Sequence, residues 1–540
     1  NSERWGFVRR ATLVNDGLEG IRVDLLDGIQ NVLPCGLDRR FQLEYSTLAD
    51  GYKRTELLPH TGLALFCLSS IPVDKAEPSE ALCANLAWST GLDQAKRLLS
   101  SSQFEAFRRG LTLQQETDVR GLRGAYMLNA TVDLAPRATR EWLIVAEVDQ
   151  NATKVRALDR HIRETAGLGA AVLADVAEGT RNLIHIVASA DGLQLTGDEA
   201  SCRRHFSNTL FNVMRGGLPA DGYRVTRDDF RAFLGRANRM VAQRHASCLA
   251  ALPETLTLGD CKALAGRLGD PDLVRLTHEH LPLTFSRRHG DPSRPWNIFS
   301  IRVQDESGRK RLDYQGNWRD IFQNWEALGH TYPGLLESMI TKFLDCSTAD
   351  GYNPYRIMRD GFEWETIDPH DAWSFIGYWG DHQVIYLLKL LEASSRFHPG
   401  QLAGLLSQRI FSYADVPYRL KPYRELIANP RSTILFDQAA HREVLARAAE
   451  LGWEGKVLMG PEGPCRSNLT EKLLLVALTK LTNFIPEAGI WMNTQRPEWN
   501  DANNALVGFG ISMVTLCYLR RYLAFCRALF RSAGPGPREV

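Results

Sequence analysis

The hydrophobic period of this 540-residue chain changes near residue 150, and this change limits the folds open to it more than any other feature. Before it, apolar and polar residues alternate in stretches such as 20–28 and 142–148, as in half-buried β-strands. After it, apolar residues recur three and four positions apart, as in 154–163, which is typical of amphipathic helices. A chain of this length exceeds one ordinary hydrophobic core, so we expect two or three domains.

The pattern predicts a multidomain β plus α fold with three parts. Residues 1–150 are expected to form an antiparallel β-sandwich with a short helix near 93–100, because turn residues separate short strands. Residues 151–285 are expected to be a helical linker, and the polar, Pro-rich run 286–295 marks a boundary. Residues 286–540 predict an α/α architecture, with helices at 320–328, 333–344, 380–392, 402–410, 438–451, 470–484 and 505–529.

Charge and motifs exclude several classes of function. Lys plus Arg total 64 against 63 for Asp plus Glu, so no basic field favours a nucleic-acid partner. The longest apolar stretch, 511–530, contains Arg520 and Arg521, and each charge would cost about 2.5–3.5 kcal/mol in a bilayer. This stretch therefore predicts a core helix and no membrane partner. No Gly-x-x-x-x-Gly-Lys-[Ser/Thr] and no Gly-x-Ser-x-Gly sequence occurs, so nothing favours nucleotide hydrolysis or a serine hydrolase.

The ten cysteines lie far apart, without a Cys-x-x-Cys pair or a Cys/His run at metal-ligand spacing. They predict buried thiols in a reducing compartment and no metal site. The first residues lack a basic segment followed by an apolar one, so nothing directs export. We therefore expect a cytoplasmic location.

Three segments combine Trp with carboxylate and amide side chains: 314–325, 373–383 and 495–504. Aromatic faces stack against sugar rings, and Asp, Asn and Arg can hydrogen-bond sugar hydroxyls that would otherwise lose water. The alternative is that Asp320, Asp381 and Asp501 merely begin helices, where Asp is favoured. Because three such segments recur in one half of the chain, they favour a sugar-binding pocket.

At these residues the sequence resembles the cellobiose and chitobiose phosphorylase family and the related β-glucan phosphorylases. Trp499-Asn500-Asp501 is similar to the family's Gly-Asp-Trp-Asn-Asp-Gly motif, with Glu498 and Ala502 as departures. Residues 318–324 resemble the family's Phe-Arg-Asp-Gln-Leu-Gln-Asp segment, and 378–382 more loosely its Arg-Phe-Ser-Asp-Asp segment. Residues 25–34 and 211–215 look like parts of its sandwich and linker.

The resemblance implies a β-sandwich, a helical linker and an (α/α) barrel of six hairpins, of which this chain would supply part. It implies that Asp501 is the catalytic general acid, with Glu498 beside it as the alternative acid. The residues expected to bind substrate are Arg319, Asp320, Gln323, Trp499, Glu498 and, more weakly, Asp381. Residues 286–540 offer fewer helical segments than a closed barrel needs, so we expect a chain cut at both ends.

The activity implied by the resemblance is inverting phosphorolysis of β-glycosidic bonds in gluco-oligosaccharides, giving an α-sugar 1-phosphate. It needs no cofactor, because inorganic phosphate is the co-substrate, and a homodimer is expected from the resemblance alone. One alternative is an inverting hydrolase, with Asp320, Asp381 or Glu365 as the base about 6.5–9.5 Å from the acid. A further alternative is an inactive or carbohydrate-binding fragment.

Overall fold

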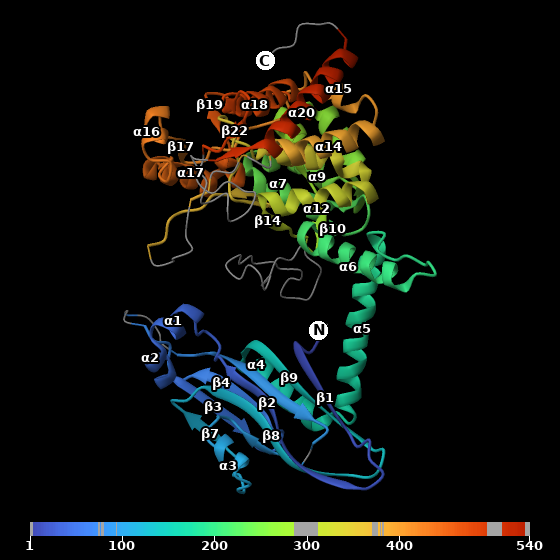
Figure 1. Ribbon diagram of the computed structural model, residues 1–540, viewed down its shortest axis with the longest axis vertical. Coiled ribbons are helices and arrows are strands. Elements are labelled where there is room, and N and C mark those ends of the chain that lie inside the picture. Colours follow the sequence, from blue (N-terminus) through green and yellow to red (C-terminus); the bar gives the residue numbers. More distant parts are fainter. Residues whose placement is uncertain are drawn as a thin grey trace. The chain divides into compact units, whose positions relative to one another are not determined.

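The computed structural model describes residues 4–73, 76, 80–92, 94–285, 312–369, 376–377, 380, 383–493 and 510–534, and of Arg319 only the backbone. The chain divides into two compact units, Asn1–Ile186 and Val187–Val540 (Figure 1). The first is built mainly from strands and the second mainly from helices. This division does not test the expected borders at residues 150 and 285, which stay predictions.

The first unit contains two antiparallel sheets, as the alternating pattern predicts. The larger has the strand order β1 (Phe7–Val14), β9 (Thr139–Asn151), β5 (Cys83–Thr90), β4 (Leu63–Leu68), β3 (Lys53–Leu58) and β7 (Asp118–Arg120). The smaller has the order β2 (Ile21–Val32), β8 (Gly124–Leu134) and β6 (Lys96–Leu98). The helices of this unit are α1 (Arg39–Glu44), α2 (Ser46–Gly51), α3 (Phe104–Arg108), α4 (Ala152–Glu164) and α5 (Leu168–Ser189), the last of which continues into the second unit.

Both faces of the larger sheet are covered. On one face, Phe66 and Trp142 join Tyr126 and Leu128 of β8 in a core shared with the smaller sheet. On the other, Trp88 and its neighbours pack with side chains of α4 and α5. Alternate residues of each strand thus meet a different apolar layer, and this burial is the main stabilising contribution to the unit.

The helix expected near 93–100 is wrong for the residues that the structure describes there. Lys96–Leu98 form β6, which pairs with β8 from Lys96↔Asn129 to Leu98↔Met127. The next two backbone N–H groups, of Leu99 and Ser100, donate to the Glu116 carboxylate at 2.7 and 2.9 Å. These partners lie distant in the sequence, so local helix propensity could not reveal them.

The second unit is mainly helical. Its helices are α6 (Glu199–Gly216), α7 (Arg227–Ala237), α8 (Arg239–Arg244), α9 (Ala246–Ala250), α10 (Leu258–Leu268), α11 (Pro271–Glu279), α12 (Trp318–Thr331), η1 (Pro333–Leu335), α13 (Leu336–Asp345), α14 (Gln383–Phe397), α15 (Gln401–Leu405), α16 (Tyr423–Ala428), α17 (Gln438–Leu451), η2 (Trp453–Lys456), α18 (Leu469–Leu481) and α20 (Met513–Ser532). α14 packs against α12, α13 and α20, and every residue of α13 is buried. The six-hairpin barrel stays a prediction.

Short antiparallel strands join the loops of this unit. They pair as β10 (Leu218–Pro219) with β13 (Leu283–Thr284), β11 (Arg224–Thr226) with β12 (Thr255–Thr257), β17 (Tyr418–Leu420) with β18 (Ile434–Phe436), and β19 (Met459–Gly460) with β20 (Gly463–Pro464). Two three-stranded sheets are β14 (Gln315–Asn317), β15 (Arg356–Met358) and β16 (Gly361–Glu363), and β21 (Phe484–Ile485), β22 (Gly489–Trp491) and β23 (Ile511–Ser512). The β10–β13 pair brings the two ends of segment 220–282 together.

Two of the expected helices differ from the structure. The helix predicted at 402–410 ends at Leu405, and Phe411 instead bridges to Ser467. Of the helix predicted at 505–529, residues 505–509 lie outside the described residues, and α20 begins at Met513, because Ile511–Ser512 pair with β22 and Ser512 caps the helix by accepting from Thr515 N. Both differences arise from contacts between distant segments.

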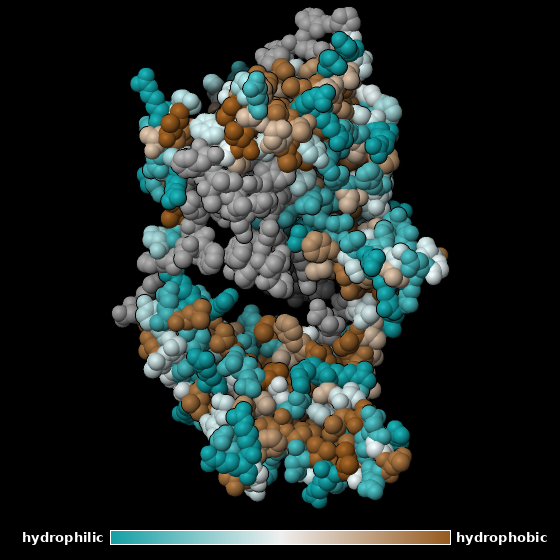
Figure 2. Space-filling model, viewed as in Figure 1, coloured by the Kyte–Doolittle hydropathy of each residue, from teal (hydrophilic) through white to brown (hydrophobic). Residues whose placement is uncertain are grey.

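The apolar stretch at 511–530 is buried on one side only. α20 buries Leu519, Tyr522 and Cys526, whereas Met513 and Val514 are exposed. Figure 2 shows brown, hydrophobic atoms over α18 and α20. Among the described residues, none of the helices has the length and the apolar character that crossing a membrane requires.

The cysteines are all free, but they are not all buried. Cys261, Cys346 and Cys526 are buried as expected, whereas Cys517 is exposed and the other six are half-buried. The prediction of buried thiols is therefore wrong for most of them.

Asp270 gives helix α11 a stability that depends on pH. Its carboxylate caps the helix by accepting from Asp272 N at 2.9 Å and meets His245 Nε2 at 2.8 Å. Burial alone would raise the pKa of Asp270, but the bonds from His245, from Arg244 and from the backbone N–H groups at the start of α11 together outweigh burial and lower the pKa to about 2. Since the unfolded value is about 3.9, this stabilisation is complete above about pH 4 and is lost as the pH falls towards 2.

We expect Asp270→Asn to unfold more easily in urea at pH 7 and to lose less stability than the wild type between pH 4 and pH 2, because Asn can cap the helix but carries no charge. Urea unfolding at a series of pH values measures both effects. Parallel pH dependences of the two proteins would show that the carboxylate is not coupled to folding.

Candidate functional site

A pocket of about 740 Å³ opens among loops at the ends of helices in the second unit. One wall is the loop 346–355, which follows α13, and another is the segment that leads into β17. The C-terminal end of α18 completes it. Its lining residues are Thr348, Ala349, Asp350, Tyr352, Ala414, Asp415, Val416, Tyr418, Arg419, Leu420, Leu458, Leu478, Thr479, Thr482 and Asn493. This volume lies within the range of small-molecule sites.

The loop 346–355 contacts two of the Trp- and Asp-containing segments through Asn353, a fully buried side chain. With its amide oriented to satisfy its neighbours, the Asn353 oxygen accepts from Trp318 Nε1 at 2.8 Å. The Gln383 side-chain amide lies 3.0 Å away on the other side. Trp318 belongs to the first segment and Gln383 ends the second.

Tyr352, in the same loop, contacts the last described residue before the third segment. Its hydroxyl donates to Asn493 Oδ1 at 3.3 Å, and the described range ends at Asn493, two residues before the third segment begins at 495. Its ring also packs against Gly380, where an added Cβ would lie 3.0 Å from the ring and 2.8 Å from Lys480 Nζ. Gly380 directly precedes Asp381. The loop 346–355 therefore contacts two of the three segments and a residue two positions before the third.

The predicted site residues fall into two groups. Asp381, Glu498, Trp499 and Asp501 lie outside the described residues, as does the Arg319 side chain, so their roles stay predictions. Asp320 and Gln323 lie on α12, Asp320 buried and Gln323 exposed.

Asp320 is directed to α6 and does not line the pocket. Its Oδ1 lies 3.7 Å from Arg215 Nη1, and its own side chain is almost fully buried. It sits in the first turn of α12, where a carboxylate is favoured by the helix dipole, but the N-cap residue is Asn317. Arg215 in turn lies over the Phe211 ring, 3.9 Å from its centroid.

Sequence reasoning did not single out the acidic residues that line the pocket, Asp350 and Asp415. Asp415 pairs with Arg447 at 2.5 Å, and Asp350 accepts from the Thr348 hydroxyl. Both lie in short loops that also contain tyrosines, 350–355 and 413–418. The mixture of aromatic and carboxylate residues used for the three segments would have found them if Tyr had been weighted like Trp.

Glu365, considered above as a base, is near the pocket. Its Oε2 accepts from Gly377 N at 2.8 Å, and its backbone oxygen accepts from the hydroxyl of Tyr418, a lining residue. Burial, followed by the charge of Glu365, raises the pKa of Tyr418. Tyr418 therefore stays neutral at neutral pH and acts as a hydrogen-bond donor.

We expect Tyr352→Ala to lower kcat/KM for sugar cleavage more than Tyr352→Phe. The Phe variant loses the hydroxyl with its bond to Asn493, about 0.5–1.5 kcal/mol or up to about tenfold, whereas the Ala variant also loses the ring against Gly380. Steady-state kinetics with a β-linked oligosaccharide measures both. Tyr332→Phe, which removes a hydroxyl bonded to Ser189 O, is the matched control and should retain full activity. Full activity of Tyr352→Ala would separate this loop from the site.

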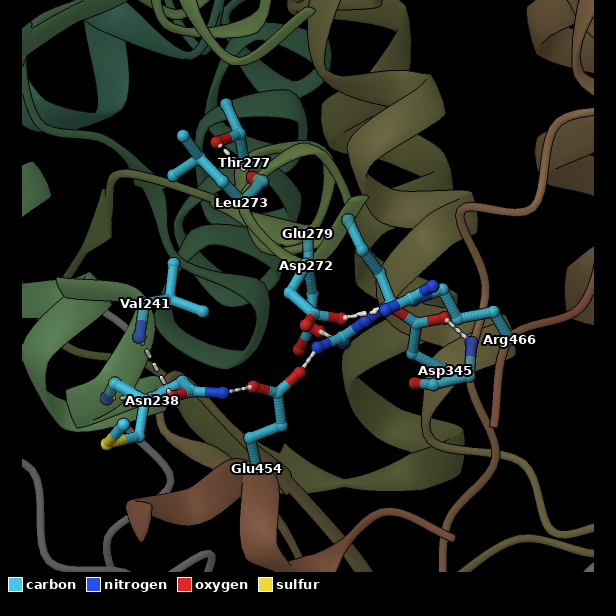
Figure 3. Close-up of polar contacts among 12 residues, drawn as sticks. Asn238, Val241, Asp272, Leu273, Thr277, Glu279, Asp345, Glu454 and Arg466 are labelled. Atoms are coloured by element: carbon cyan, nitrogen blue, oxygen red, sulfur yellow. Dashed lines mark hydrogen bonds and ion pairs between the residues drawn. The ribbon is translucent and has the colours of Figure 1, made fainter. Parts of the chain in front are cut away.

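A buried cluster of charged residues lies at the end of α13, where the loop 346–355 begins. Arg275 and Glu279 of α11 meet Lys342 and Asp345 of α13 and Glu454 of η2, and none of the five is more than 2% exposed. Figure 3 shows Glu279, Asp345 and Glu454 close together. Arg275 pairs with Glu454 and lies 3.8 Å from Glu279, which accepts from Lys342 Nζ at 2.7 Å. Asp345 accepts from Ser412 N at 2.8 Å.

The charges in this cluster shift one another's protonation. Burial and then the charge of Glu279 raise the pKa of Asp345 well above its usual value. Burial alone would lower the pKa of Lys342, but the charges of Glu279, Tyr314 and Cys346 and the bond to Glu279 together outweigh burial and raise that pKa. Nearby, Lys472 donates to Leu344 O at 2.9 Å, and burial lowers its pKa to about 7. The end of α13 is thus tied to α11, η2 and α18.

Residues 220–282 match the family model described as glycoside hydrolase family 149 insertion domain 1. No curated protein matches the chain. The matched segment lies between β10 and β13, so its two ends meet, as expected of an inserted domain. It includes α11, whose Arg275 and Glu279 are buried in the charge cluster, so it is packed into the second unit.

This match supports a carbohydrate-active enzyme of the glycoside hydrolase type. The model that matches describes an insertion domain of glycoside hydrolase family 149. The match covers residues 220–282 alone. It does not single out the cellobiose and chitobiose phosphorylases, so that finer assignment remains a proposal.

Proposed function

We propose that the chain supplies the sugar-binding and acid-bearing part of an inverting glycoside phosphorylase that acts on β-linked gluco-oligosaccharides. The observation that carries this proposal is the loop 346–355, which contacts two of the three Trp- and Asp-containing segments, and Asn493 two residues before the third, beside a pocket of about 740 Å³. The family match over 220–282 supports a carbohydrate-active enzyme of the glycoside hydrolase type. The proposal includes a β-sandwich at 1–150, a linker at 151–285 and a partial (α/α) barrel at 286–540.

In the proposed reaction, Asp501 donates its proton to the glycosidic oxygen as the bond from that oxygen to the anomeric carbon breaks. An oxygen of inorganic phosphate attacks the anomeric carbon from the opposite face, which inverts a β-linkage into an α-sugar 1-phosphate. Phosphate is already an anionic nucleophile, so no second carboxylate is needed as a base. Asp501 must hold a proton near neutral pH, and desolvation by Trp499 is the proposed cause of the raised pKa this requires.

A second candidate is an inverting hydrolase, which is favoured by the two carboxylates that line the pocket, Asp350 and Asp415. Such an enzyme needs a base about 6.5–9.5 Å from the acid, to leave room for the attacking water. Either residue could be this base, as could the nearby Glu365 or Asp381, which lies outside the described residues.

Phosphate dependence separates the two candidates. The full-length protein is incubated with a panel of β-linked glucose disaccharides and oligosaccharides, with and without inorganic phosphate. The proposal predicts cleavage only when phosphate is present. Equal release of reducing sugar in both buffers would identify a hydrolase, and sugar binding without cleavage in either buffer would leave a binding protein.

Arg319→Lys is expected to weaken oligosaccharide binding, because the planar guanidinium fork can hold two hydroxyl oxygens at once and an ammonium cannot. The loss of one charge-assisted bond corresponds to about 1.5–3 kcal/mol, or about 10- to 150-fold in Kd. Isothermal titration calorimetry without phosphate measures binding alone. The control is Lys389→Arg. Lys389 forms an ion pair with Glu326, which lies on the same helix as Arg319, and this variant should bind the oligosaccharide normally. Unchanged binding by Arg319→Lys would remove this residue from the site.

A further inference from the structure

Three side chains with metal-binding atoms meet in the first unit. Cys35 follows β2, Cys83 begins β5, and Asp149 lies near the end of β9. One ligand atom from each, two Sγ and a carboxylate oxygen, lie within 4.8 Å of one another. These residues come from distant parts of the sequence, so no spacing rule connects them.

The spacing of the ligand atoms fits a tetrahedral ion. Cys35 Sγ lies 3.4 Å from Asp149 Oδ1. With Zn–S of about 2.3 Å and Zn–O of about 2.0–2.2 Å, the edges of a tetrahedral site are about 3.5 Å between S and O and about 3.8 Å between two S atoms. The three atoms would therefore need only small shifts to bind one zinc-sized ion.

The backbone at Asp149 departs from regular β-strand geometry. The pairing of β5 with β9 shifts register between Ala84 and Leu86, which marks a β-bulge, and Asp149 has a left-handed φ of 54°. Few residues other than glycine adopt this conformation, although Asp tolerates it better than most. A bulge redirects a side chain that would otherwise follow the regular alternation. Here the redirected carboxylate meets the Cys35 thiol.

Asn85 hydrogen-bonds to the backbone beside two of the three metal-binding side chains, Cys35 and Asp149. It lies two residues after Cys83 on β5, so both side chains lie on the same face of the strand. Its Oδ1 accepts from Asp149 N at 3.0 Å, and its Nδ2 donates to Leu33 O at 2.8 Å, just before Cys35. A polar residue that orients ligand-bearing segments is the usual companion of a metal site.

The charge and the exposure of the cluster also favour a cation. Within the described residues, no Lys, Arg or His forms an ion pair with Asp149. Both cysteines are half-buried and Asp149 is exposed, so a water molecule can reach the group. Two sulfur ligands favour a soft transition metal over Mg²⁺ or Ca²⁺, which prefer oxygen.

We propose that Cys35, Cys83 and Asp149 bind one divalent ion of the zinc class, with water as the fourth ligand. The thiolates are the ligands, so each bound ion releases the two thiol protons to the solvent. The ion would link the segment after β2 to β5 and β9. Folding and metal binding are then coupled, and zinc raises the melting temperature of this unit.

The test uses the reduced, metal-free full chain titrated with Co²⁺ as a spectroscopic substitute for Zn²⁺. We expect one equivalent to produce a sulfur-to-cobalt charge-transfer band with tetrahedral d–d bands, and Zn²⁺ to displace it. Cys35→Ser, Cys83→Ser and Asp149→Asn should each weaken binding by at least about tenfold. Asp149→Asn retains the size and backbone preference of Asp, so its metal-free melting temperature should match the wild type.

Cys202→Ser, a half-buried thiol on α6, is the matched control and should bind Co²⁺ normally. The proposal is overturned if no charge-transfer band forms at one equivalent, or if the band persists in all three variants, which would mean an adventitious ion only. A Cys35–Cys83 disulfide in protein purified with zinc present would overturn it as well.

Discussion

Asp501→Asn is expected to lower the rate of β-glycosidic bond cleavage by about 10²–10⁴-fold, the usual contribution of a general acid. The amide has nearly the size of the carboxylic acid but cannot transfer a proton to the leaving oxygen. Sugar binding and thermal stability should stay close to the wild type. Steady-state kinetics, calorimetric titration with sugar and the melting temperature measure the three properties separately.

Glu498→Gln is the matched comparison, because Glu498 is the alternative acid three residues earlier. If the large loss occurs in Glu498→Gln and not in Asp501→Asn, the two roles are exchanged. If Asp501→Asn instead fails to fold, Asp501 serves to begin a helix, and the sugar-cleaving assignment loses its acid.

Arg275→Met is expected to lower the free energy of unfolding by about 3–5 kcal/mol, the typical result of removing one partner from a buried ion pair. Arg275 is fully buried, and its removal leaves Glu454 with the Asn238 amide but without its cation. The end of α13 and the loop 346–355 depend on the same cluster, so activity should fall at temperatures well below the melting point of the wild type. Urea unfolding and activity measured against temperature test both.

The double variant Arg275→Met with Glu454→Met is the control, because it removes the lone buried charge. We expect it to be more stable than Arg275→Met alone, since apolar residues can replace a buried pair at little cost. If the two effects simply add, Arg275 and Glu454 are not coupled and the cluster does not anchor the loop.

Periodicity predicted the elements whose signals are local. β2 and β9 follow from alternating residues, and the helix expected at 438–451 is α17, Gln438–Leu451, because Asp437 caps its start and Gly452 ends it with a positive φ. β6 and the start of α20 were missed because their pairing partners, β8 and β22, lie far along the chain. Register between distant strands is not encoded in a local window.

Composition identified the three Trp- and Asp-containing segments, but not the loop 346–355, which contacts two of them. The role of Asn353 depends on Trp318 and Gln383, and that of Tyr352 on Gly380 and Asn493, and none of these pairs has a recognisable spacing. The same holds for Cys35 and Asp149, which meet only through a bulge in β9. A search by Cys/His spacing could not find them.

The anomeric form of the first product tests the central claim most directly. The full-length protein is mixed with a β-linked gluco-oligosaccharide and inorganic phosphate, and ³¹P and ¹H NMR spectra are recorded from the first turnovers. Inverting phosphorolysis predicts an α-sugar 1-phosphate as the first product in the wild type and its near absence in Asp501→Asn. A β-sugar 1-phosphate, or free sugar formed before any phosphate ester, would contradict the account.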